Sequence, residues 1–137
     1  MQTKFVKTQK AVLFAAGSLL TLVAGFILGA PAAFYGSNGI DPGANLSLLN
    51  ELKAPAGLLL VAGLYMLTAV FRQRLADNAT ALAALIYLSY AISRFASMVF
   101  DGTPASGLVQ AAALEAIIGL ACLAILSIRQ MPAGRAA

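Results

Sequence analysis

The sequence contains no histidine and only one cysteine, and just 10% of its 137 residues are charged. The lack of histidine and the single Cys122 exclude a disulfide framework, a zinc cluster and histidine-ligated haem within one chain. We therefore expect no cofactor, and we expect Cys122 to be a small packing residue. A soluble domain of this length carries about 25% charged residues. The shortage of charge therefore predicts a membrane protein.

Four long apolar runs support this prediction, at residues 11–30, 55–71, 79–100 and 108–128. Each lies within the range of about 17–25 residues that crosses the hydrocarbon core of a bilayer. The first run is longer than the apolar region of about 7–15 residues in a cleaved signal peptide, so we expect it to remain as a helix. We predict an all-α, polytopic membrane protein in which residues 1–137 form one integral membrane domain. Its fold would be an antiparallel bundle of four transmembrane helices.

The basic residues predict the orientation of this bundle. With four spans, seven of them fall on one side of the membrane: Lys4, Lys7, Lys10, Arg72, Arg74, Arg129 and Arg135. Lys53 is alone in the opposite loops. Positive charge concentrates on the cytoplasmic side of membrane proteins, so both termini should be cytoplasmic. The basic residues are not clustered as a nucleic-acid interface requires, which leaves the lipid bilayer as the expected partner.

The outer loop, residues 31–54, contains turn residues and one predicted helix. Phe34 and Tyr35 are expected at the level of the lipid headgroups, where aromatic side chains are enriched. Asp41 and Pro42 are residue types that can act as the N-cap and the first residue of a helix.

Three leucines follow in this loop at near-helical spacing, namely Leu46, Leu49 and Leu52. They predict a short amphipathic helix on the outer surface. Pro55 would then break or kink the chain before the second span.

Small residues predict where the helices approach each other closely. Gly25 and Gly29 form a GxxxG motif in the first span, and Gly107, Ala111 and Gly119 lie four or eight residues apart in the fourth. Such stripes allow close backbone contact in lipid. The motif fits either a contact within the chain or a homo-oligomer face.

Two opposite charges inside the spans carry the functional argument. Arg94 lies about 9 Å below the outer end of the third span, and Glu115 lies about 10 Å below the same surface in the next. An unpaired charge in the bilayer centre costs at least about 2.5–3.5 kcal/mol. The short hairpin between the two helices therefore predicts that Arg94 and Glu115 pair.

Other polar residues predict a track that leads outward from this pair. Steps of three and four residues along the third span give one seam: Thr80, Ala83, Tyr87, Tyr90, Arg94, Ser97 and Asp101. Tyr65 of the second span can face the same interior, and Glu51 and Lys53 lie near its mouth. The candidate ligand-binding residues are therefore Arg94, Glu115, Glu51, Lys53, Asp101, Tyr65, Tyr87 and Tyr90.

A structural interpretation stays open beside this functional one. Polar residues between membrane helices often serve only to hold the helices together. The Arg94–Glu115 pair could fix helix register, the tyrosines could be packing residues, and Asp101 could cap the hairpin.

Three segments carry a resemblance to a known family, namely "NELKAPAGLLLVAGLY", "YAISRFASMVFDGTP" and "ALEAIIGL". The chain resembles a family of small bacterial membrane proteins with four spans, known as domain of unknown function 4345. The resemblance places the family's intramembrane arginine on Arg94 and its helix-four glutamate on Glu115. It also places the acidic-x-basic step on Glu51 and Lys53, where members more often have arginine than lysine. It implies the bacterial inner membrane and no established activity.

Two functions follow from these observations. The first is an outward-facing pocket that binds a small anionic or lipid-like molecule around Arg94 and Glu115. The second is a structural role, as an accessory or assembly subunit of a membrane complex or as a homo-oligomer. Support for an enzyme is thin, because we find no nucleophile–base pair, metal set or phosphate loop.

Overall fold

The structure, a computed structural model, describes residues 2–130, so Arg135 of the basic set lies outside the described residues. The elements are α1 (Gln2–Gly29), α2 (Pro31–Gly36), α3 (Leu46–Phe71), the short 3₁₀ helix η1 (Gln73–Leu75), α4 (Ala76–Phe100) and α5 (Ser106–Gln130). Four of these helices are long and apolar enough to cross a membrane. The predicted all-helical chain with four candidate spans is thus confirmed, and a multi-pass membrane protein is the class that it indicates.

The prediction of a separate amphipathic helix on the outer surface is wrong. The Asn45 side chain caps α3 by accepting a hydrogen bond from the Leu48 amide at 3.1 Å, and α3 then continues through Pro55 to Phe71. Proline removes one hydrogen bond and clashes with the preceding turn, but the capped turns before it and the long apolar helix after it keep the helix continuous. Asp41 does not cap a helix, because its carboxylate accepts from the Gly43 amide at 2.8 Å and closes a turn.

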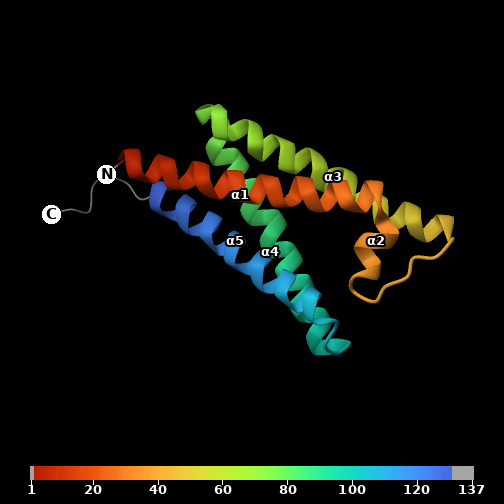
Figure 1. The fold of residues 1–137 in the computed structure, drawn as a ribbon. Coiled ribbons are helices and arrows are strands. Elements are labelled where there is room, and N and C mark those ends of the chain that lie inside the picture. The colour runs from red at the N-terminus through yellow and green to blue at the C-terminus, as the bar shows by residue number, and fades with distance from the viewer. Residues whose placement is uncertain (1, 131–137) are drawn as a thin grey trace.

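The long helices form two pairs that diverge. Helix α1 packs along α3, and α4 packs along α5, while the contacts between the two pairs are less extensive. Figure 1 shows the pairs close together near the N-terminus and the end of α5, which we call the termini end. They spread apart toward the opposite end, which carries α2 and the α4–α5 turn and which we call the loop end.

The buried core follows this divergence. Buried side chains of the main apolar cluster lie at residues 13–24 of α1, 59–69 of α3, 76–87 of α4 and at Cys122 of α5. In α3, α4 and α5 these residues lie in the termini half of the helix, whereas in α1 they lie around and just beyond its middle. The loop halves of the helices are therefore left to surround a space between the pairs.

Glycine permits the closest helix contact within the α1–α3 pair. A Cβ placed on Gly63 would lie 2.9 Å from the Gly17 carbonyl oxygen, so the two backbones meet where neither residue has a side chain. Gly119 of α5 permits a different close contact, because a Cβ there would lie 2.6 Å from the Leu88 side chain of α4. A Cβ placed on Gly25 or Gly29 would meet no other part of the described chain within 4 Å. As a contact within the chain, the predicted GxxxG motif is wrong, and its role in a homo-oligomer stays a prediction.

A polar cluster joins the helices at the termini end. The fully buried Gln9 amide donates to Asp77 Oδ1 at 2.9 Å and to the Thr80 hydroxyl at 3.1 Å. Its carbonyl oxygen accepts from Arg129 at 3.1 Å, and Arg129 also pairs with Asp77. Hydrogen bonds among α1, α4 and α5 therefore help to hold this end of the bundle together.

Candidate functional site

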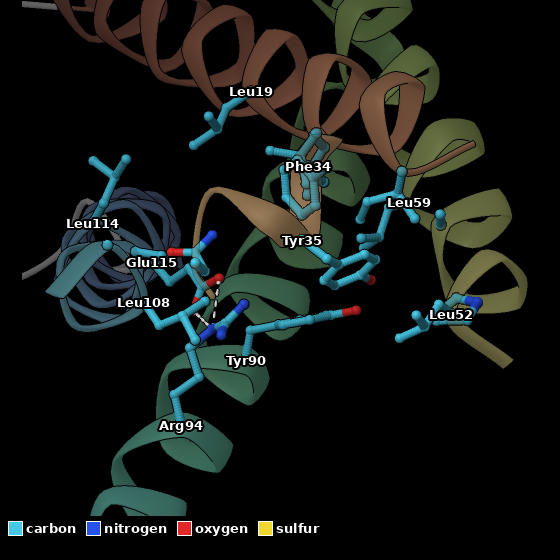
Figure 2. Close-up of a pocket in the computed structure, with 18 of the residues that line it drawn as sticks. Leu19, Phe34, Tyr35, Leu52, Leu59, Tyr90, Arg94, Leu108, Leu114 and Glu115 are labelled. Atoms are coloured by element: carbon cyan, nitrogen blue, oxygen red, sulfur yellow. Dashed lines mark hydrogen bonds and ion pairs between the residues drawn. The ribbon is translucent and has the colours of Figure 1, made fainter. Parts of the chain in front are cut away.

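A cavity of about 450 Å³ lies between the two helix pairs in the loop half of the molecule. All four long helices line it, and α2 with the following loop lies against it (Figure 2). Its wall is mostly aliphatic. The polar side chains on the wall are Tyr35, Asn38, Tyr87, Tyr90, Arg94 and Glu115. Small-molecule sites are typically clefts of roughly 300–1,000 Å³ with apolar walls and a few polar groups, so this cavity has the size and composition of a binding site.

Arg94 and Glu115 face each other across the α4–α5 contact. Arg94 Nε lies 3.0 Å from Glu115 Oε2 and 3.3 Å from Oε1, so both carboxylate oxygens share one guanidinium nitrogen. The Glu115 side chain is 15% exposed and that of Arg94 is 31% exposed. The two residues meet because the α4–α5 turn is short and each lies within a few helical turns of it.

The remaining edge of the guanidinium lies at the cavity wall. Within residues 2–130, the two Nη nitrogens of Arg94 make no hydrogen bond. The guanidinium carbon lies 6.0 Å from the centre of the Tyr90 ring, within the range of a cation–π contact. Figure 2 shows the guanidinium between Glu115 and Tyr90. Arg94 therefore presents hydrogen-bond donors to the cavity while Tyr90 and Glu115 hold it in place.

Helix α2 adds two aromatic residues to the wall. Phe34 and Tyr35 pack edge to face with their ring centres 5.2 Å apart. The Tyr35 and Tyr90 hydroxyls in Figure 2 point away from Arg94 and toward α3. Partial burial raises the pKa of Tyr35, and the nearby Tyr90 raises it further, whereas Arg94 opposes the shift. Tyr35 therefore stays protonated at neutral pH and offers both a donor and an acceptor.

Half of the candidate residues named from the sequence reach the cavity. Arg94, Glu115 and Tyr90 line it with their polar groups. Tyr87 contributes its ring, because its hydroxyl is buried and donates to the Ala16 carbonyl oxygen at 2.7 Å. That bond joins α4 to α1 and leaves the Tyr87 hydroxyl engaged.

The other four candidates lie elsewhere. Tyr65 packs against the buried core of the termini half. Asp101 is exposed and accepts a hydrogen bond from the Ser97 hydroxyl at 2.8 Å. Glu51 is exposed and Lys53 is half-buried, and neither is part of the cavity wall within the described residues.

The sequence did not place α2 or its following loop in the site. Phe34, Tyr35, Asn38 and Ile40 all line the cavity. The aromatic pair was visible in the sequence, and Pro31 gave a signal for a helix start, because proline is favoured in the first helical turn. No periodicity could show where so short a helix docks, since its position depends on the space between two helix pairs.

Comparison with known proteins gives a family match. No curated protein and no solved structure matches this chain. Residues 8–126 match the domain of unknown function DUF4345. The matched region contains α2, the cavity and the Arg94–Glu115 contact, so the site lies inside the family domain rather than in an appended segment. The chain therefore belongs to the DUF4345 family, as the resemblance of its motifs implied.

Proposed function

We propose that this protein is a small integral membrane protein whose loop-end cavity binds a small anionic or lipid-like molecule. One observation carries the proposal, namely that the Nη edge of Arg94 adjoins a largely aliphatic cavity of about 450 Å³. An arginine that served only to hold two helices together would need no such space beside it. The aliphatic wall suits a hydrocarbon chain, and the Nη donors of Arg94 suit a polar head.

The orientation of the bundle belongs to the same proposal. The four long helices would cross the membrane as an antiparallel bundle, in the inner membrane of a bacterium. Among the residues described, Lys4, Lys7, Lys10, Arg72, Arg74 and Arg129 lie at or near the termini end. Positive charge favours the cytoplasmic side, so both termini would be cytoplasmic. The cavity would then open toward the outer leaflet, from which an amphipathic molecule could enter.

The alternative is a structural role in a homo-oligomer or a larger membrane complex. The observation that favours it is the outer face of α1, where a Cβ placed on Gly25 or Gly29 would meet no other part of the described chain within 4 Å. Phe26 lies beside them with 58% of its surface exposed. Small residues next to a large apolar one allow close contact between helices in lipid.

Native mass spectrometry of the gently extracted protein separates these functions. Ala111 lines the cavity, whereas Ala113 is exposed on the same helix, about 200° around its axis, and provides a matched control. We expect a reproducible small-molecule adduct on the wild type and on Ala113→Phe. Ala111→Phe should lose it, because the new ring occupies the cavity. A wild type that carries no adduct would contradict the binding function, and stable association with other chains would favour the structural one.

A further inference from the structure

The charge balance at Arg94 limits which head group the cavity can hold. We propose, building on the binding function above, that the cavity takes an amphiphile with one negative charge and that Glu115 takes up one proton as this molecule binds. The head group would bind the Nη edge of Arg94. Glu115 would change from the carboxylate partner of Arg94 to a neutral carboxylic acid.

The geometry explains how a head group can bind Arg94 while Glu115 stays in place. Glu115 directs both of its oxygens to Nε of Arg94, at 3.0 and 3.3 Å, and so uses one nitrogen of the guanidinium. The two Nη nitrogens form a planar pair of donors that matches the spacing of two oxygens in a carboxylate. A monoanionic head can therefore bind Arg94 without displacing Glu115 from the site.

Electrostatics then requires Glu115 to take up a proton when a negatively charged head group binds. An ionised Glu115 together with an ionised head would place two negative charges beside one positive charge in an apolar cavity. Two carboxylates that share a site cannot both remain ionised at low cost, so one of them binds a proton. The head carries its charge opposite the free donors, whereas Glu115 can lose its charge and still accept from Nε.

The surroundings offer no other way to balance the charge. The cavity-lining side chains of α1 and α3 are all uncharged. Tyr87 and Tyr90 of α4 and Tyr35 of α2 face the site as neutral phenols, and Glu115 is the acidic residue that α5 contributes to the wall. Arg94 is the single cation on the wall among the described residues. A second negative charge is therefore balanced by a proton from solution, which adds to a Glu115 oxygen without breaking any other bond.

A pH dependence follows from this balance. The complex holds one proton more than the free protein, so a rise in pH favours the free protein. The affinity for a monoanionic amphiphile should fall by about tenfold for each pH unit, over the range in which Glu115 is protonated only in the complex. An uncharged amphiphile of the same length brings no charge to balance, so its affinity should not change with pH.

Isothermal titration calorimetry of the detergent-purified full chain tests this proposal with dodecanoate and dodecanol as probes. Titrations in two buffers with different ionisation enthalpies give the number of protons taken up per molecule bound. We expect close to one proton with dodecanoate on the wild type and close to zero with dodecanol. Glu115→Gln should bind dodecanoate with close to zero uptake, and Glu51→Gln, an exposed carboxylate on α3, should behave as wild type.

The outcomes separate this inference from the binding function. Dodecanoate binding without proton uptake on the wild type, or with unchanged uptake on Glu115→Gln, would overturn the proton coupling and leave the binding function standing. If neither probe binds, or if Ala111→Phe binds both as well as the wild type, the binding function fails and the coupling fails with it. If Glu115→Gln does not fold, the wild-type titrations with the two probes still test the proton coupling.

Discussion

Replacing Arg94 and Glu115 by glutamine, singly and together, gives the sharpest test of the contact between them. Glutamine keeps much of the length of either side chain and removes its charge. If the two charges stabilise each other, each single change leaves one charge without its partner, and the double change leaves none. The double variant should therefore be more stable than the sum of the single effects implies.

The expected magnitudes follow from the exposure of the two side chains. Arg94→Gln strands a carboxylate that is 15% exposed, whereas Glu115→Gln strands a guanidinium that is 31% exposed and closer to water. An unpaired charge in the bilayer centre costs about 2.5–3.5 kcal/mol. We discount this figure for the remaining exposure and expect a loss of roughly 2–3 kcal/mol for Arg94→Gln and roughly 1–2 kcal/mol for Glu115→Gln.

The double variant should lose less than these two values together. Two glutamines at this distance can hydrogen-bond to each other, and polar pairs between membrane helices contribute about 0.6 kcal/mol on average. We expect the double variant to lose about 1–2 kcal/mol, which gives a coupling energy of roughly 2 kcal/mol. The measurement is equilibrium unfolding in mixed micelles, followed by far-ultraviolet circular dichroism.

The experiment also needs a control variant and a measurement of whether each variant keeps the bound molecule. Arg72→Gln removes an exposed arginine outside the cavity and should change the free energy of unfolding little. Additive single effects would refute the stabilising contact. A double variant that regains stability but loses the bound molecule supports the binding function, and one that keeps the molecule would show that Arg94 does not bind it.

Two further predictions concern helix packing. Gly63→Ala should destabilise the protein by about 1–3 kcal/mol, because the new methyl would lie 2.9 Å from backbone atoms of Gly17 and Thr21 that cannot move without separating α1 from α3. The control Gly57→Ala adds a methyl that meets nothing within 4 Å, so it should be neutral or stabilising. Equal stability of the two variants would contradict the close contact. Gln9→Leu should lower the free energy of unfolding by about 1–3 kcal/mol, measured by thermal unfolding or by unfolding in mixed micelles, because it removes a buried amide that hydrogen-bonds to α4 and α5. An unchanged stability would mean that the cluster does not hold the termini end together.

Features that depend on one helix, or on two helices joined by a short turn, were predictable from the sequence. The apolar runs gave the four long helices because crossing a bilayer sets both the length and the composition of a span. The contact between Arg94 and Glu115 was predictable for a related reason. Residues at similar depths on either side of a short turn have little freedom to lie apart, and an intramembrane charge strongly favours a partner.

Features that depend on how the helix pairs pack were decided only by the tertiary structure. Gln9 looks like one polar residue in a basic N-terminal segment, yet it is fully buried because Asp77, Thr80 and Arg129 converge on it from α4 and α5. Gly17 and Gly63, rather than the more recognisable Gly25 and Gly29, make the close contact because helix rotation sets which stripe faces the partner.

The cavity itself belongs to this second group. The sequence by itself determined that the chain consists of long apolar helices and that a charged pair lies near one end. It could not determine that α1–α3 and α4–α5 would diverge there, or that α2 would place Phe34 and Tyr35 against the resulting space. The physical reason is that periodicity and charge cost act within a helix or a hairpin, whereas a cavity is the volume left where separate pairs of helices fail to meet.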